Sequence, residues 1–233
     1  MALMADVAAQ YRNIMARMGE AAMKAGRDAR AVRLLAAAKS QSVEAIRAAV
    51  AVGAALIGEN YVQEAQEKKR AILEPVEWHM IGHLQRNKVK PAVELFDVIE
   101  TLDSAALARA LDREGEKLGK TVRTYIEINL AGEKTKSGVA PDRLAPLLEE
   151  VGKLPRVTVE GLMTVPPMQE QAESARGYFH ALWELREKFR AAGLSNINLK
   201  ELSMGMSNDF AVAIEEGATI VRIGTALFGP RGR

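Results

Sequence analysis

Apolar positions recur along the chain with two spacings, and these alternate from residue 33 almost to the C-terminal end. Short, largely apolar runs are typical of buried strands, and the segments between them have the three- and four-residue apolar spacing of amphipathic helices. The predicted strands cover residues 33–39, 55–60, 76–82, 97–102, 122–130, 157–163, 199–203 and 219–223, with 122–130 the longest. The predicted helices cover residues 42–52, a segment through 64 and 70, 86–92, 103–118, a segment after Pro141, 172–192 and 209–216.

Eight strand–helix units in about 200 residues match the arithmetic of a (β/α)8 barrel. Strands that are apolar on both faces belong in a parallel sheet covered by helices. A doubly wound open sheet also alternates, but it normally has fewer strands and a glycine-rich first turn, whereas residues 39–42 contain no glycine. The sequence therefore predicts an α/β fold, a single (β/α)8 TIM barrel that occupies residues 1–233 as one domain.

A further amphipathic helix precedes the first strand. Its apolar face has members three or four residues apart, namely Met4, Val7, Ala8, Tyr11, Ile14, Met15, Met18 and Ala22, and Gly26 marks its end. We expect this segment, residues 1–26, to pack on the outside of the barrel.

The composition excludes several classes of function. The 32 basic and 30 acidic residues give a net charge of only +2, and no basic stripe interleaved with aromatic residues indicates nucleic-acid binding. The chain has no cysteine, which excludes disulfides, thiolate catalysis and cysteine-ligated metals. It has neither a signal-peptide pattern nor an apolar run of the roughly 20 residues that span a bilayer. We expect a soluble, cytoplasmic monomer that binds neither nucleic acid nor membranes.

Candidate chemistry gathers where the predicted strands end, because barrels bind ligands at that edge. Lys39 ends the first strand, and a lysine that loses part of its hydration there has an amine available for Schiff-base chemistry. The alternative is a solvated lysine in an ordinary loop. After the seventh and eighth strands, Ser203, Gly205, Gly224 and Thr225 offer hydroxyls and main-chain N–H groups where barrels usually hold a phosphate. The alternative is two ordinary turns that contain glycine.

Arg222 is unusual because it interrupts the apolar eighth strand. Strand alternation places its side chain on the face opposite Val221 and Ile223. A buried guanidinium needs an acceptor, since leaving it unpaired costs several kcal/mol. A ligand is one source of that acceptor, and a structural ion pair with Glu201 or Glu127 is the other.

His79 and His83 do not form a metal pair, because four residues along a strand span about 13 Å. We predict no metal site, with His79 inside the barrel and His83 in a loop near its mouth.

Six segments together resemble the YggS/PROSC family, the pyridoxal phosphate homeostasis proteins. They are Leu35–Lys39, Ile57–Glu64, Trp78–Lys88, Gly161–Thr164, Leu202–Phe210 and Val221–Gly229. These motifs are long and occur in order, and the resemblance extends from near residue 1 to Gly229. It implies a barrel like the N-terminal domain of alanine racemase, the fold-type III group, that holds pyridoxal 5′-phosphate (PLP).

The resemblance also implies roles for single residues. Lys39 matches the Schiff-base lysine, and Arg222 matches the arginine that faces the pyridine nitrogen. The matches to the phosphate cup are Ser203, Gly224 and Thr225. The matches to the other surroundings of the cofactor are Asn60, His83, Met163 and Met206. One departure is Asn208, where an aspartate is common, and a helix-cap position tolerates that exchange.

The implied function is vitamin B6 homeostasis: a protein that is not an enzyme keeps PLP bound and delivers it to apo-enzymes. A fold-type III amino-acid racemase is the first rival. It would need a second acid/base group, which similar racemases take from a separate domain and a partner subunit, and 233 residues leave no room for that domain. A lysine-dependent aldolase that uses Lys39 on a phosphorylated sugar is the second rival, and it would be colourless.

Overall fold

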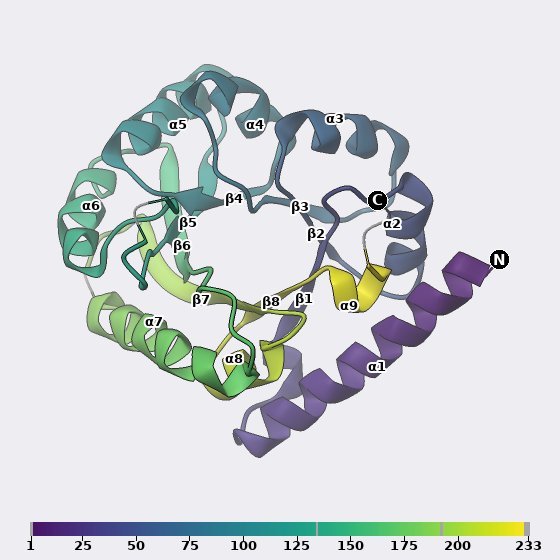
Figure 1. The fold of residues 1–233 in the computed structure, drawn as a ribbon. Helices are drawn as coiled ribbons and strands as arrows, with labels where there is room; N and C mark the ends of the chain where they lie inside the picture. The colour runs from purple at the N-terminus through teal and green to yellow at the C-terminus, as the bar shows by residue number, and fades with distance from the viewer. Residues whose placement is uncertain (1, 134, 192, 231–233) are drawn as a thin grey trace.

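The computed structural model, which describes residues 2–133, 135–191 and 193–230, is a closed barrel of parallel strands (Figure 1). The strands pair in chain order, and β8 pairs with β1. They are β1 Arg33–Ala37, β2 Leu56–Glu59, β3 Glu77–Met80, β4 Val98–Leu102, β5 Val122–Glu127, β6 Val157–Met163, β7 Ile197–Met206 and β8 Ile220–Ile223. The predicted (β/α)8 barrel is confirmed.

Helices surround the barrel (Figure 1), as expected for a parallel sheet whose outer side is covered by helices. They are α1 Ala2–Lys24, α2 Val43–Ala51, α3 Val62–Ala71, α4 Val89–Leu95, α5 Ala105–Leu118, α6 Leu144–Val151, α7 Arg176–Phe189, α8 Phe210–Glu215 and α9 Thr225–Phe228. Short 3-10 turns are η1 Ala29–Ala31, η2 Arg86–Lys88, η3 Pro141–Arg143 and η4 Ala172–Ala175. The N-terminal helix α1 lies across the outside of this ring and packs on α2, α8 and α9 (Figure 1).

Local sequence signals fix several helix ends. Ser42 and Ser104 cap α2 and α5, where their hydroxyls accept from the N–H groups of Ala45 and Leu107. Gly119 ends α5 at a φ of 62°, a left-handed conformation that glycine adopts without steric cost. No helix in the described ranges has the length and apolar character needed to cross a membrane.

Several strand ends differ from the sequence-based prediction by one to three residues. β1 stops at Ala37, so Lys39 lies in the following turn rather than at the strand end. β5 stops at Glu127, and beyond it Ile128 makes an isolated bridge to Val139. Among the described strands β7 is the longest, at ten residues. Its first half alternates buried and exposed positions, a pattern that a search for continuous apolar runs does not detect.

The barrel interior holds both apolar and polar side chains. Its apolar cluster consists of Leu35, Leu56, Val98, Tyr125, Met163 and Ile220. Four polar side chains from β3, β4, β7 and β8 are also buried: His79, Glu100, Ser203 and Arg222. Buried polar groups must be hydrogen-bonded to one another or to a ligand, so these four connect the core to the site above it.

Candidate functional site

A cavity of about 550 Å³ opens at the carboxyl ends of the strands. Its wall comes from the loops after β1, β2, β3 and β5–β8, and includes Lys39, Asn60, Lys136, Gln169, Met206, Ser207, Asp209, Arg222, Gly224 and Thr225. Six of the nine residues singled out from the sequence thus lie on one cavity: Lys39, Asn60, Met206, Arg222, Gly224 and Thr225. Its volume falls within the roughly 300–1,000 Å³ of small-molecule sites.

Lys39 occupies the turn that follows β1. Its side chain is half-buried, and its Nζ lies 5.3 Å from the centroid of the Tyr61 ring. The turn is closed by the N–H of Gln41, which donates to the carbonyl of Ala38 at 2.9 Å. Lys39 thus contributes to the cavity wall from the turn after β1, with its amine close to an aromatic face.

Arg222 forms part of the cavity wall from inside the barrel and is only 4 % exposed. Its Nη1 donates to the main-chain oxygen and the hydroxyl of Ser203, and its Nη2 donates to the main-chain oxygen of Thr164, each at 2.7 Å. Burial lowers the pKa of Arg222, and the charges of Glu100, Glu127 and Asp209 oppose that shift.

The structural ion pair with Glu201 that the sequence left open does not form. Glu201 instead pairs with Arg33 at 2.9 Å. The carboxylate nearest to Arg222 is that of Glu100, at 4.0 Å. Arg222 is thus held mainly by neutral oxygens, which leaves its positive charge uncompensated by a close ion pair.

Beneath Arg222 the polar contacts continue into the core. The Ser203 hydroxyl donates to Glu100 Oε2 at 2.5 Å, and His79 Nδ1 bonds Glu100 Oε1 at 2.6 Å. Burial would lower the pKa of His79, but the hydrogen bond to Glu100 and the negative charges of Glu100 and Glu77, the latter 3.6 Å from Nε2, outweigh it and the pKa is raised. The predicted position of His79 inside the barrel is confirmed, and the bond to Glu100 explains how a polar ring is accommodated there.

The loops after β7 and β8 meet at the cavity. Ser207 Oγ accepts from the N–H of Ala226 at 3.1 Å, which leaves the hydroxyl proton of Ser207 free to donate. The N–H of Thr225 is in the first turn of α9, where it has no partner within the helix. Ser207, Gly224 and Thr225 all line the cavity, and the hydroxyl and N–H groups there are hydrogen-bond donors suited to an anion.

Three of the predicted site residues do not line this cavity. Ser203 and Met163 are fully buried below it, because both lie within strands whose inward positions fill the barrel. His83 is in a loop, as expected, but its Nδ1 lies 3.4 Å from Asp103 Oδ2 beside a neighbouring cavity. Asn208 is not a helix cap either: Asp209 is the N-cap of α8, and its carboxylate accepts from the N–H of Met206 at 2.6 Å.

The sequence reasoning missed several cavity residues. Ser207 lies in the Leu202–Phe210 segment, but the sequence analysis gave it no role of its own. It follows β7, whereas Ser203 lies within β7, and this difference in position is the signal that distinguishes the two serines. Lys136 has no such signal, because it lies in the long connection after β5. Its amine pairs with Glu133 at 2.7 Å. Within the described ranges, no group of three or more His, Asp or Glu side chains is arranged to hold a metal ion.

Comparison with known proteins gives a consistent picture. Residues 6–232 match the family described as the N-terminal domain of alanine racemase. The pyridoxal phosphate homeostasis protein of Aquifex aeolicus is 45% identical over 94% of this chain and 95% of its own length. The pyridoxal phosphate homeostasis protein of Pseudomonas aeruginosa is 39% identical over 98% of this chain and 97% of its own length. The structure of PipY from Synechococcus elongatus with PLP bound has a TM-score of 0.79 at 37% identity, over 85% of this chain and 93% of PipY.

The chain shares its barrel with PipY, and it matches these relatives over nearly its full length. These matches place the chain in the same family as the relatives. The chain belongs to the alanine racemase N-terminal domain family and, within it, to the pyridoxal phosphate homeostasis proteins of the YggS/PROSC group.

Proposed function

We propose that this chain binds PLP in the 550 Å³ cavity, holds it covalently through Lys39 and releases it to other proteins. The observation that carries the proposal is that one cavity brings together an amine, a buried guanidinium and a set of anion donors, on Lys39, Arg222, Ser207 and Thr225. The names of the relatives and the PLP bound to PipY support it.

The donor set fits the chemistry of each part of the cofactor. An amine binds an aldehyde, a guanidinium donates to the acceptor nitrogen of an unprotonated pyridine ring, and hydroxyl and N–H donors bind a phosphate. In this arrangement Asn60 and Met206 form part of the remaining wall. When bound, PLP supplies an aldehyde that condenses with amines and a ring that accepts electrons.

We further propose that the chain stores the cofactor and does not use it for catalysis. Electron withdrawal by the ring is strongest when its nitrogen carries a proton, and a carboxylate partner secures that proton. Arg222 is a donor that remains charged, so it disfavours a proton at the nitrogen it faces. Its bonds to Ser203 and Thr164 hold the guanidinium in place for that role.

An amino-acid racemase is the second candidate, and the observation that favours it is Lys136. Racemisation needs acid/base groups on both sides of the substrate, and Lys136 adds a second amine to the wall that contains Lys39. The pairing of Lys136 with Glu133 places a carboxylate beside that amine. Activity measurements distinguish the two candidates, as described in the Discussion.

A titration tests the binding proposal. Adding PLP to the purified protein should produce a saturable visible absorption band, and Lys39→Ala should abolish it. A lysine-dependent aldolase would give no such specific band. If the unaltered protein shows no band, the proposal is refuted. Three further points stay predictions. Reactivation assays would test whether apo-enzymes receive the cofactor, cell fractionation would test the cytoplasmic location, and sedimentation would test the monomeric state.

A further inference from the structure

Two side chains of α3 hold the peptide groups on either side of Lys39. Lys68 Nζ donates to the carbonyl of Ala38 at 2.8 Å. The N–H of Ser40 donates to Glu64 Oε2 at 3.0 Å. Glu64 and Lys68 are four residues apart, so they lie on one face of α3 and contact each other at 3.3 Å. The backbone of Lys39 is thereby fixed from both sides by one helix.

The ammonium group of Lys68 is buried and fully satisfied. Its side chain is 10 % exposed, and besides Ala38 it donates to Glu59 Oε1 at 2.7 Å. An ammonium has three donors, and Ala38, Glu59 and Glu64 supply three acceptors. Glu59 is fully buried, and burial raises its pKa while Lys68 opposes the shift. Because the Ala38 carbonyl is one of these acceptors, the buried charges of Lys68 and Glu59 are coupled to the position of the Lys39 turn.

The turn needs such support because its backbone is strained. Ser40 has a φ of 61°, in the left-handed region that residues other than glycine rarely occupy. Such a conformation persists only where the surroundings hold it. Glu64 holds the turn here by accepting from the N–H of Ser40. Partial burial would raise the pKa of Glu64. Hydrogen bonds from Ser40 and Lys68, together with the positive charges of Lys68 and Lys39, outweigh burial, so the pKa is lowered.

We propose that Glu64 and Lys68 are positioning residues that hold the Lys39 amine in the geometry for condensation with an aldehyde, an inference that rests on the proposed function. In that condensation the nitrogen of Lys39 forms a C=N bond with the aldehyde carbon, and the aldehyde oxygen leaves as water with the two amine hydrogens. Neither positioning residue contacts the ligand. Their contribution is to orientation, which strongly affects the rate at which two groups react.

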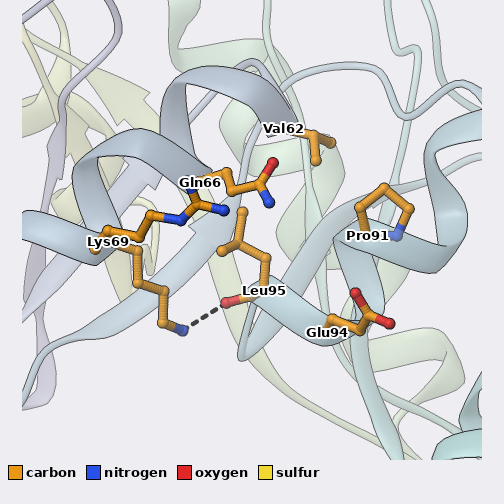
Figure 2. Close-up of a pocket in the computed structure, with 7 residues that line it drawn as sticks. Val62, Gln66, Lys69, Pro91, Glu94 and Leu95 are labelled. Carbon is orange, nitrogen blue, oxygen red and sulfur yellow. Dashed lines mark hydrogen bonds between the residues drawn. The ribbon is translucent and has the colours of Figure 1, made fainter.

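Matched variants of α3 test this role. Lys68→Met removes the donor to Ala38, and Glu64→Ala removes the acceptor for Ser40, whereas Glu64→Gln keeps an acceptor oxygen. Lys69→Met is the control, because Lys69 is the next residue and its amine donates to the carbonyl of Leu95 in the groove between α3 and α4, at 2.5 Å (Figure 2). Two quantities are measured: the rate of condensation with PLP, and the affinity for pyridoxamine 5′-phosphate, which has the same ring and phosphate but no aldehyde.

We expect Lys68→Met and Glu64→Ala to slow condensation about tenfold or more, with the affinity for pyridoxamine 5′-phosphate within about twofold of the unaltered protein. Glu64→Gln should restore most of the rate and Lys69→Met should change neither quantity. If Lys68→Met does not fold, because Glu59 is left unpaired, Glu64→Ala decides the question, since Glu64 is partly exposed.

The remaining outcomes overturn the inference in distinguishable ways. Condensation as fast in both variants as in Lys69→Met removes the positioning role and leaves the proposed function intact. A parallel loss of condensation rate and of pyridoxamine 5′-phosphate affinity shows a general structural effect and also removes the role. No condensation in the unaltered protein removes the proposed function itself, and the inference with it.

Discussion

The guanidinium of Arg222 donates to both oxygens of Ser203, the main-chain oxygen and the hydroxyl, at 2.7 Å each. This contact places Ser203 beneath the cavity as a support for Arg222, whereas the sequence had placed it in the phosphate cup. The adjacent hydroxyl that does line the cavity is that of Ser207. We therefore expect these two serines, four residues apart, to have separate roles, which substitutions can distinguish.

Ser203→Ala should destabilise the fold without changing the selectivity for a phosphate. The substitution removes the hydroxyl that donates to Glu100 and accepts from Arg222, and unsatisfied buried partners cost about 1–3 kcal/mol. Chemical denaturation measures the stability, and the ratio of affinities for PLP and pyridoxal measures the selectivity. A larger fall of that ratio in Ser203→Ala than in Ser207→Ala would return Ser203 to the phosphate cup.

The phosphate should contribute a large part of the affinity. Hydrogen bonds to a charged group contribute about 1.5–3 kcal/mol each, so losing several makes pyridoxal at least about a hundredfold weaker than PLP. Ser207→Ala should reduce this difference, because it removes the hydroxyl donor of the set. Competition with inorganic phosphate provides an independent measurement, and equal affinity for the two vitamers would refute the proposed anion donors.

The bound cofactor should support little chemistry, for the reason that Arg222 disfavours a proton on the ring. We expect no measurable racemisation or transamination of common amino acids, together with reactivation of an apo-enzyme by the loaded protein. Arg222→Glu should increase the exchange of the α-hydrogen of bound amino acids, if the variant still binds PLP. Robust alanine racemase activity that disappears in Lys39→Ala or Lys136→Ala would establish the enzyme instead.

Glu77 should make the stability depend on pH in the acid range. The His79 ring, 3.6 Å away, and the hydrogen bond from Arg123 at 2.6 Å lower the pKa of Glu77 from 4.5 to about 2, against burial. A carboxyl with a depressed folded-state pKa stabilises the fold above its unfolded-state pKa, and that stabilisation is lost as the pH falls through the folded-state pKa. The difference in unfolding free energy between the protein and Glu77→Gln should be constant above about pH 5.5 and shrink toward pH 2. A difference that does not vary with pH would contradict this account.

The fold followed from the sequence because its signals are periodic and local. Alternation along the eighth strand placed Arg222 on the face opposite Val221, and the structure shows its side chain buried in the barrel. The same reasoning did not predict that Ser203 and Met163 lie below the cavity. A strand pattern shows which side of the sheet a side chain occupies, but not its level along the barrel axis. His83 faces Asp103, a partner from another loop that no local pattern reveals. The proposed one-domain organisation of residues 1–233 stays a prediction.

The proposed function depends on a covalent link between Lys39 and the cofactor, and borohydride reduction of the loaded protein tests for that link. Reduction converts a covalent C=N link into a stable bond, so peptide mass mapping then identifies the lysine that carries the cofactor. We predict a single phosphopyridoxyl group on Lys39, and no comparable labelling in Lys39→Ala. Label spread over surface lysines, with Lys39 unmodified, would contradict the account.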